Sequence, residues 1–450
     1  MLLNHVATAA AAALLVGSVV LSESLVKPEP RKDGRVVVTY WEKWSDFEAE
    51  AMRKVVDKFN KSQDKIFVEF SSVSNVAGKT LLATSGGIPP DIAGLFGPNV
   101  AQYAYNNAVI PLDEMAAEAG IKRDNYIHQY YDFCTYRGHL WALPTTPAST
   151  ALHYNRKLLA DSGWDPNSPP KTLEELTKLD EMAFKKENGV IVRMGFLPSE
   201  PGWWNWAWGP IFGGKFWNGT DRITMTDPNN IEGYTWMGSF AKRYGSGTVQ
   251  SFQQGFGGFN SAQNAFMDNK VACVLQGVWM ANFIEKHNPD LDWGAAPFPY
   301  PEKRPDLANS SLLDLDILVI PVGAKHPKEA FEFIKFVQQQ ENMELLCLGQ
   351  KKHSPLAQVS PGFFENHPNP NIELFQNLSK SGTTLAPPKT PIWPQWSDEI
   401  NTMVQSINSG SKTPEQALRD VQTKMQPILD NCLRHERALG IQPRSEDNGE

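Results

Sequence analysis

Tryptophan is the residue type whose number and spacing most strongly indicate a binding site in this sequence. The 450 residues include 14 Trp, beside 23 Phe and 11 Tyr. An indole has a large flat apolar face and one hydrogen-bond donor, so it can fill a core or stack on a ligand. Trp203 and Trp204 are followed by three further Trp before Gly219, among glycines and prolines that favour a loop over a core-facing helix.

Patterns of the common enzyme and metal sites are not present. A glycosidase needs two carboxyl groups at a set separation, and no spacing pairs the carboxylates near the Trp-rich segment, which are Glu200, Asp221 and Asp227. The nine His form no H-x-x-x-H or H-E-x-x-H pattern, and neither a G-x-S-x-G nor a Walker sequence occurs. We therefore expect no catalytic residue, no metal and no cofactor.

The elements that would position the tryptophans alternate between strand and helix. Residues 36–41 predict a strand, 46–59 a helix and 66–70 a second strand, which together form a βαβ unit. Such a unit implies a parallel sheet covered by helices, and hence an α/β fold. Two extended runs, joined by a Pro-containing segment, are expected at 138–144 and 150–155, and further strands at 272–275 and 317–321. Further helices are expected at 100–107, 112–119, 157–162, 172–185, 231–244, 261–269, 278–286, 327–340, 396–407 and 413–429.

Several tryptophans follow predicted strands directly. Trp41 and Trp44 come at the end of the first strand, at the edge where open α/β sheets bind ligands, and Trp279 follows the strand 272–275. Trp396 opens a C-terminal helix after two prolines. Sugar rings have apolar C–H faces that pack on indoles, so these positions predict a carbohydrate ligand. Each of them can also be ordinary packing, which is the interpretation for Trp141, Trp164, Trp236 and Trp293.

The charge balance limits the kinds of partner. Lys+Arg 42 against Asp+Glu 50 gives a net charge of -8, with no long basic run, so nucleic acid and anionic membrane surfaces are disfavoured. The four cysteines, Cys134, Cys273, Cys347 and Cys432, form no C-x-x-C pair. We expect buried or free thiols, although an exported chain would allow one disulfide.

The first thirty-five residues predict export. Residues 6–21 are an uncharged apolar run, which suits a signal peptide and is shorter than the ~20 residues of a spanning helix. A polar linker follows to residue 35, and its Lys27 and Arg31 lie after the run, opposite to the usual orientation. The segment is predicted to be either cleaved or retained as a transmembrane anchor, with the protein periplasmic or on the cell surface.

A series of short motifs runs in a set order along the chain. It includes the opening strand and helix 36–70, G-I-P-P-D-I at 87–92, V-I-P-L-D at 109–113, G-H-L-W-A-L-P at 138–144, P-P-K-T-L-E-E-L at 169–176, F-M-D-N-K-V-A at 266–272 with G-V-W at 277–279, W-G-A-A-P-F-P at 293–299, I-P-V-G-A-K at 320–325 with E-A-F-E-F-I-K-F at 329–336, and T-P-E-Q-A-L at 413–418. This order resembles the family 1 extracellular solute-binding proteins of ABC importers, the sugar-binding class that includes maltose-binding protein.

The resemblance implies a type II periplasmic-binding-protein-like fold, with two α/β lobes that close on a ligand about a hinge. By analogy, lobe 1 covers 36–146 and 303–352, lobe 2 covers 147–302 and 353–440, and 441–450 is a tail. The first crossing between the lobes is expected at 145–149, where prolines would suit a hinge.

The resemblance also implies a set of ligand contacts. The expected residues are Trp41, Trp44, Ser45, Leu95, Asn99, Thr146, Trp203, Trp204, Trp279, Asp314 and Trp396. Where the maltodextrin binders have a Trp and an Asp this chain has Leu95 and Pro98, and Ala148 replaces a Glu of the first crossing. Asp314 or Asp316 is a candidate for the missing carboxylate, unless the two simply end a strand in solvent.

The leading hypothesis is a monomeric receptor that captures a mono- or oligosaccharide and delivers it to an ABC permease. A second hypothesis is a polysaccharide-active enzyme that uses Glu200 or Asp227 in the same aromatic cleft. A third is a binder of glycerol phosphodiesters or another small solute, which would need a basic pocket. The predicted cleft loops contain only Lys43 as a cation.

Overall fold

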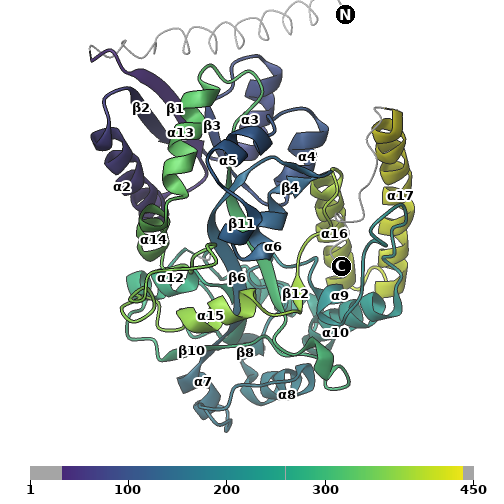
Figure 1. Cartoon of the computed structure of the whole chain (residues 1–450). Coiled ribbons are helices and arrows are strands. Elements are labelled where there is room, and N and C mark those ends of the chain that lie inside the picture. Colours follow the sequence, from purple (N-terminus) through teal and green to yellow (C-terminus); the bar gives the residue numbers. More distant parts are fainter. Residues whose placement is uncertain (1–32, 259, 439–450) are drawn as a thin grey trace, which may run out of the picture.

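A computed structural model describes residues 33–258 and 260–438 of the chain (Figure 1). The apolar run 6–21 and the tail 441–450 lie outside the described residues, so the predictions made for them stay predictions. Within the described part, no helix has both the length and the apolar character needed to cross a bilayer.

One mixed sheet extends through both halves of the described structure, in the strand order β2-β1-β3-β11-β6-β9-β8-β7. Along the chain its strands are β1 (Val36–Glu42), β2 (Ile66–Ser72), β3 (Ile92–Phe96), β6 (Leu143–Asn155), β7 (Lys185–Glu187), β8 (Val190–Phe196), β9 (Val271–Gly277), β10 (Trp293–Ala296), β11 (Ser311–Val319) and β12 (Thr384–Leu385). β10 pairs with β6, and β12 pairs with β11. A separate hairpin is formed by β4 (Thr135–Tyr136) and β5 (His139–Leu140).

Helices cover this sheet, as the α/β prediction requires. They are α2 (Asp46–Ser62), α3 (Val76–Ser85), α4 (Asn99–Tyr105), α5 (Asp113–Glu118), α6 (His128–Phe133), α7 (Arg156–Asp161), α8 (Leu173–Ala183), α9 (Trp208–Ile211), α10 (Pro228–Tyr244), α11 (Ser246–Gln253), α12 (Met280–His287), α13 (Pro327–Val337), α14 (Gln340–Gly349), α15 (Ile372–Ser379), α16 (Trp393–Asn408) and α17 (Pro414–Ala438), with short 3-10 turns η1 (Arg123–Asn125) and η2 (Pro305–Leu307). Thr172 caps α8 by accepting a hydrogen bond from the Glu175 N–H at 3.2 Å, whereas Ser45 makes no such bond at α2.

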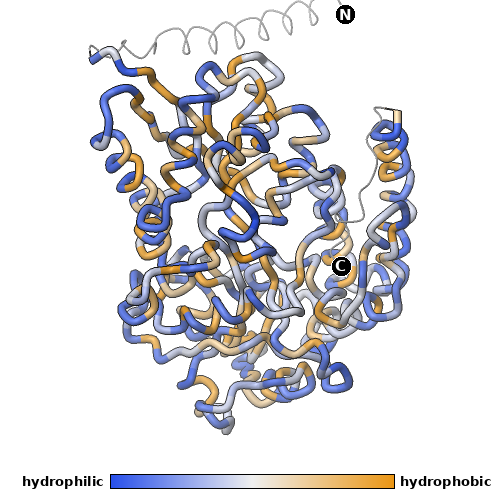
Figure 2. Tube along the Cα trace, in the orientation of Figure 1, coloured by the Kyte–Doolittle hydropathy of each residue, from blue (hydrophilic) through white to orange (hydrophobic). Residues whose placement is uncertain are grey.

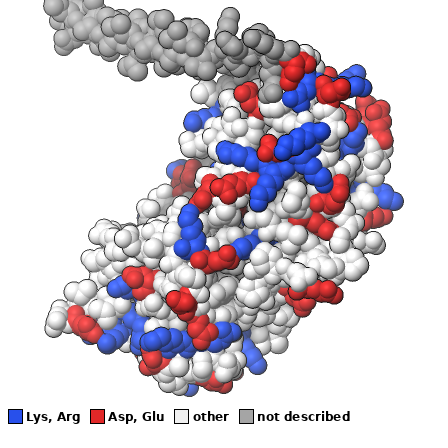
Figure 3. Space-filling view, turned by 90° about the vertical axis from the view of Figure 1, so that its left-hand side faces the viewer, with Lys and Arg blue, Asp and Glu red and all other residues white. Residues whose placement is uncertain are grey.

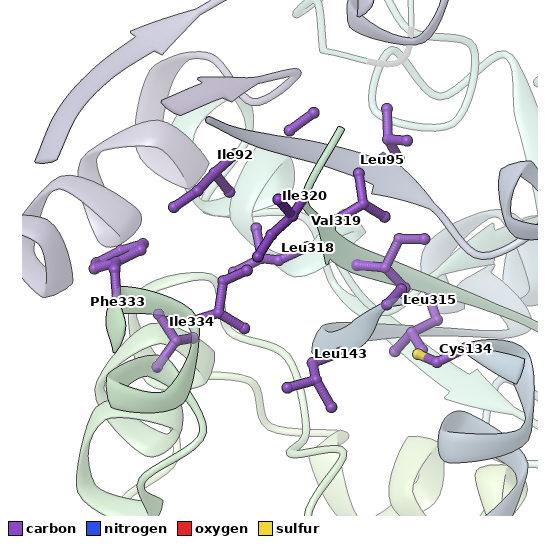
Figure 4. Packing of buried hydrophobic residues seen from close by; sticks show 14 of the residues in the cluster. Ile92, Leu95, Cys134, Leu143, Leu315, Leu318, Val319, Ile320, Phe333 and Ile334 are labelled. Carbon is purple, nitrogen blue, oxygen red and sulfur yellow. The ribbon is translucent and has the colours of Figure 1, made fainter. Parts of the chain in front are cut away.

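The buried residues form two large cores, one in each half of the molecule, which confirms the two-lobed fold. The first core packs β1, β3 and the end of β11 against α2 and α13, and includes Leu95, Leu318 and Phe333 (Figure 4). The second packs β8 and β9 against α8, α10, α16 and α17, and includes Phe196 and Trp208. In Figure 2 apolar segments lie inside both halves. Where one lobe ends and the other begins stays a prediction.

β6 and β11 run from one core to the other and are the crossing strands between them. They pair antiparallel, with Asp314 opposite Ala148 and Leu315 opposite Pro147, and the register shifts between Leu315 and Ile317. We expected two short runs joined by a Pro-containing segment, but residues 143–155 form one continuous strand. Proline lacks the ladder N–H and is tolerated in sheets at bulges, and the register shift lies next to Pro147.

The expected helix at 261–269 is wrong, because this segment forms a series of turns. The side chain of Asn264 accepts hydrogen bonds from the backbone N–H groups of Phe266 and Met267, at 3.1 and 3.3 Å. Asn269 has a positive φ of 56°. Asparagine side chains that bond to nearby backbone compete with helix formation. The four cysteines are buried free thiols, as predicted.

The last helix attaches the second core to the first lobe. α17 contributes Met425 and Leu429 to the second core, but its final turn places Glu436 beside the hairpin β4–β5. There the Tyr136 hydroxyl and an Arg137 guanidinium N–H each donate to the buried Glu436 carboxylate, both at 2.5 Å. A buried carboxylate held in this way is costly to disrupt, because its partners stay buried.

We expect Glu436→Ala to lower the free energy of unfolding by about 3 kcal/mol, since it leaves the Arg137 charge buried without this carboxylate. Urea denaturation followed by circular dichroism measures the loss. The control is Glu415→Ala at the exposed start of α17, which removes an exposed pair with Arg419 and should change stability by about 0.5 kcal/mol or less. Equal unfolding midpoints for Glu436→Ala and the wild type would contradict the expectation.

Candidate functional site

The crossing strands present a polar face and an apolar face between the lobes. Residues opposite each other in an antiparallel pair share a face, and successive residues alternate. The register therefore places Asp314 with Ala148 on one face, and Leu315 with Pro147 on the other. Asp316 lies on the polar face with Asp314. Figure 3 shows the surface hollowed between the upper and lower halves of the molecule.

A network of charged side chains surrounds Asp316. Lys43, just after β1, places Nζ 3.0 Å from Asp316 Oδ1 and 3.0 Å from Glu42 Oε1. Lys352, after α14, places Nζ 3.0 Å from Asp316 Oδ2 and 3.0 Å from Glu48 Oε1. The charges alternate in sign along the row Glu42, Lys43, Asp316, Lys352 and Glu48. We call these five residues the ionic row.

Hydroxyl and amide groups join the ionic row to the first crossing strand. Thr146 Oγ1 lies 3.0 Å from Asp316 Oδ2 and 2.7 Å from Gln350 Oε1. The Gln350 amide in turn donates to the Glu48 carbonyl at 3.2 Å. The ionic row thus holds together the end of β1, the start of α2, both crossing strands and the segment after α14.

Burial and charge act against each other within the ionic row. Burial raises the pKa of a carboxyl group, but for Asp316 the ammonium groups of Lys352 and Lys43 outweigh it and lower the pKa. Burial opposes the charge of Lys43, yet the Asp316 and Glu42 carboxylates raise its pKa. Burial raises the pKa of Glu42, which accepts a 2.5 Å hydrogen bond from the Tyr40 hydroxyl.

Gly94 on β3 makes room for the Glu42 carboxylate. A Cβ atom at this position would lie 1.8 Å from Glu42 Oε2. Such a clash could be relieved only by moving the carboxylate. Glycine is the residue that permits such a close approach to the backbone. The ionic row therefore depends on a glycine that is adjacent in space but 52 residues away from Glu42 in sequence.

Asp314 is the partly exposed carboxyl group of the polar face. Its Oδ1 accepts a hydrogen bond from the Leu315 N–H at 2.7 Å. Burial raises its pKa to about 7, and the neighbouring Asp316 charge adds to this effect. Near neutral pH this group is present in both protonation states, so it can donate a hydrogen bond as well as accept one.

Three tryptophans of the second lobe form an aromatic cluster. Ring centroids are 6.2 Å apart for Trp203 and Trp204, 6.1 Å for Trp203 and Trp279, and 6.3 Å for Trp204 and Trp279. Trp203 and Trp204 lie in the loop between β8 and α9, which we call the aromatic loop (residues 197–207), and Trp279 directly precedes α12. A Cβ at Gly277 would lie 2.2 Å from the Trp279 ring, so the ring packs on the backbone of Gly277. Trp203 is 40% exposed.

The segment 350–352 connects the aromatic cluster with the ionic row. On α12, which begins beside Trp279, Asn282 donates to the Gln350 carbonyl at 2.8 Å and Glu285 pairs with Lys351. The next residue of the segment is Lys352 of the ionic row. Farther along α12, Lys286 pairs with Asp46 of α2, so the two lobes also touch there. The cluster and the row thus lie on either side of one short segment.

The structure brings together some of the predicted site residues. Trp203, Trp204 and Trp279 form one cluster, and Asp314 and Thr146 lie on the crossing strands. Trp41 is partly buried against the first core. Ser45 is exposed immediately before α2.

Other predicted residues serve the fold. Leu95 is buried in the first core, and only its carbonyl reaches the site, where it accepts from Lys43 Nζ at 3.0 Å. Trp44 is buried, with Lys43 Nζ 4.8 Å above its ring. Asn99 Oδ1 accepts from the Phe96 N–H at 3.1 Å. Trp396 has no exposed surface and lies in the second core beside Phe216 and Trp393, so it is a core residue here and not a cleft residue.

Phe96, Gln350 and Lys352 border the candidate site, and none of them was among the individually named contact residues. Phe96 ends β3 with 44% of its surface exposed, and Lys43 Nζ lies 4.7 Å above its ring. Alternation along β3 is a signal that would have favoured Phe96 once Leu95 was assigned to the core. No local signal identifies Gln350 and Lys352, because they reach the site through the segment after α14.

The carboxylates considered for catalysis form no pair. Glu200 accepts a 3.1 Å hydrogen bond from Asn264, and burial raises its pKa to about 7. Asp227 caps α10 by accepting from the Asn229 N–H at 2.8 Å. Asp221 accepts from Asn218 at an exposed turn. Asp227 thus caps a helix, and Asp221 bonds to a side chain of its own turn.

Comparisons with known proteins place the chain in a family. A model described as "Bacterial extracellular solute-binding protein" matches residues 45–344. The sn-glycerol-3-phosphate-binding periplasmic protein UgpB of Pectobacterium atrosepticum is 24% identical over 405 residues, which cover 83% of this chain and 88% of that protein. A maltotriose-binding protein of Pyrococcus abyssi is 20% identical over 267 residues, or 59% of this chain and 54% of that protein.

Solved structures share the fold over most of their length. CpMnBP1 with mannobiose bound has a TM-score of 0.78 and 25% identity, and the match covers 86% of this chain and 99% of that chain. The GacH receptor of Streptomyces glaucescens has a TM-score of 0.71 and 18% identity, over 88% of this chain and 99% of that chain. The chain therefore belongs to the bacterial extracellular solute-binding protein family, as the order of its motifs had indicated.

Proposed function

We propose that this protein captures a neutral carbohydrate between its two lobes and delivers it, outside the cytoplasm, to an ABC permease. The observation that carries the proposal is the aromatic cluster of Trp203, Trp204 and Trp279, joined through segment 350–352 to a polar wall that contains Asp314. Indole faces pack on the C–H faces of a sugar, and polar side chains orient its hydroxyl groups. Relatives whose names or titles mention maltotriose and mannobiose support this ligand class.

The charge of the site favours a neutral ligand over a phosphate ester. The cations of the ionic row, Lys43 and Lys352, already contact the carboxylates of Glu42, Asp316 and Glu48. A phosphate would have to displace one of these carboxylates from a buried pair, which is costly. The relatives named for sn-glycerol 3-phosphate make this class the main alternative.

Closure about the crossing strands is the proposed mechanism. Phe47 and Phe283, from α2 and α12, meet edge to face with centroids 5.2 Å apart, and the Asp46–Lys286 pair lies beside them. Contacts of this kind between lobes stabilise a closed state. We propose lobes at 36–146 with 303–352 and at 147–302 with 353–440, and a ligand surface of Trp41, Phe96, Trp203, Trp204, Trp279 and Asp314. We also propose that the protein acts as a monomer without catalytic activity.

Trp279→Ala should weaken saccharide binding by about 2 kcal/mol, or roughly 30-fold in Kd, because it removes one side of the aromatic cluster. Isothermal titration calorimetry with mannobiose, mannotriose and maltotriose measures the change. The control is Trp164→Ala, on a surface turn of the second lobe, where the indole N–H donates to the Ser168 carbonyl at 2.8 Å. That variant should keep the wild-type Kd.

An unchanged Kd in Trp279→Ala would remove the cluster from the site. Binding of sn-glycerol 3-phosphate without binding of any of the three saccharides would replace the carbohydrate proposal by the phosphate alternative. Release of reducing ends from a polysaccharide panel, lost in Glu200→Gln, would instead support the enzyme hypothesis.

Asp314 should make stability depend on pH in a defined direction. Its pKa is raised from 3.8 to about 7, so the folded state holds the proton more tightly than the unfolded state. The tighter binding of the proton stabilises the folded state fully below pH 4, and this stabilisation is lost as the pH rises to about 7. Asp314→Asn removes the dependence. As the pH rises from 4 to 8, the free energy of unfolding of the variant should therefore increase by about 2 kcal/mol relative to that of the wild type. This is less than the full pKa shift would give, because Asp314 is partly exposed.

Urea unfolding at unit steps of pH measures this difference. A difference that is constant with pH, or one that grows toward low pH, would show that Asp314 does not titrate in this way.

A further inference from the structure

A cavity in the second lobe is lined in part by the aromatic loop. It has a volume of about 840 Å³ and is bounded by the aromatic loop, α10, α11 and the end of α16. Sites for small molecules usually measure about 300–1,000 Å³. We call it the amide pocket, because its polar lining includes Asn205, Gln250, Gln253, Gln405 and Asn408.

The lining of the amide pocket carries no charge. Nineteen of the described residues line it, and none of these is Asp, Glu, Lys, Arg or His, although charged residues make up 20% of the chain. At that frequency about four of the nineteen would be charged. Ten of the nineteen are uncharged polar residues, and these include four serines and one threonine. By contrast, a cavity of about 720 Å³ beside α6 and β12 is lined by Arg123, Asp132, Lys380 and Lys389 among others.

The amide pocket combines an apolar floor with amide and hydroxyl groups. Met237, Phe240 and Val249 are buried beneath it, whereas Gln250 and Gln405 are exposed. Amide side chains both donate and accept hydrogen bonds, as sugar hydroxyl groups do. An ionic ligand would meet no side chain of opposite charge among these lining residues. The chemistry therefore matches a neutral polyhydroxylated molecule.

The aromatic loop forms a wall of both the amide pocket and the proposed ligand surface. Ser199, Gly202 and Asn205 line the pocket, while Trp203 and Trp204 between them contact Trp279. Pocket side chains hold this loop, since Gln253 Nε2 donates to Ser199 Oγ at 2.6 Å. From α16, Asn401 Oδ1 accepts from Asn205 Nδ2 at 2.9 Å. A molecule in the pocket would meet the same residues that fix the loop.

We propose that the amide pocket is a second binding site for neutral saccharide, separate from the interlobe site. The choice of saccharide as its ligand rests on the proposed function, because the two sites share a loop and would meet the same solutes. Occupancy of the pocket restrains the aromatic loop and so favours the arrangement of Trp203 and Trp204 that the interlobe site requires.

The methyl group of Met237 reports on the pocket directly, because Met237 is one of its lining residues. In protein labelled with ¹³C at the methionine methyl groups, titration with mannotriose or maltotriose should shift the Met237 signal. The shift should persist in Trp279→Ala, because Trp279 is not one of the residues that line the pocket. The double variant Gln250→Ala/Gln405→Ala should raise the Kd for this shift at least tenfold, while Gln358→Ala, on an exposed loop that does not line the pocket, leaves it unchanged.

Two results would overturn the proposal. One is a Met237 signal that neither saccharide moves at millimolar concentration, in the wild type and in Trp279→Ala. The other is a shift that the double variant leaves unaltered, because the saccharide would then bind elsewhere. Absence of a site sensitive to Trp279→Ala, with the Met237 shift retained, contradicts the proposed interlobe function and leaves the pocket standing.

Discussion

The carboxylate of Asp316 is the contact on which the arrangement between the lobes depends. Lys43 and Lys352 each place an ammonium nitrogen 3.0 Å from one of its oxygens, and Thr146 Oγ1 lies 3.0 Å away. Buried charges persist only when they are paired and hydrogen-bonded, so the segments that carry these groups must keep their relative positions. Such a group need not increase stability over an apolar replacement. What it provides is position, because it holds the end of β1, both crossing strands and the segment after α14 together.

The ionic row also shapes the electrostatics of the proposed site. Its charges alternate, so the wall of the first lobe presents polar atoms with little excess charge. The aromatic cluster of the second lobe adds apolar faces. The two walls thus offer complementary contacts to the two kinds of surface that a sugar presents. A family that contains proteins named for sugars and for a glycerol phosphate can differ among its members in this local charge balance.

The tryptophans illustrate how one residue type divides between core and site. Trp203 and Trp204 belong to the aromatic cluster, whereas Trp206 and Trp208, only a few residues later, are buried in the second core. The chain turns into the short helix α9 at Trp208, and this turn carries the later indoles inward. Spacing in the sequence indicated a loop, but the direction of each ring depends on where the loop meets α9 and α10.

The sequence by itself determined the α/β class, the βαβ opening, the family and the choice of Trp203, Trp204 and Trp279 as candidate ligand contacts. These follow from local patterns, because periodicity, turn residues and motif order are properties of neighbouring residues. Only the tertiary structure decided that Trp396 is a core residue, that residues 143–155 form one strand despite two prolines, and that Lys352 completes the ionic row. The physical reason is that burial and charge pairing arise between segments up to about 300 residues apart, as Glu48 and Lys352 show. Such contacts leave no periodic signal in the sequence around either partner.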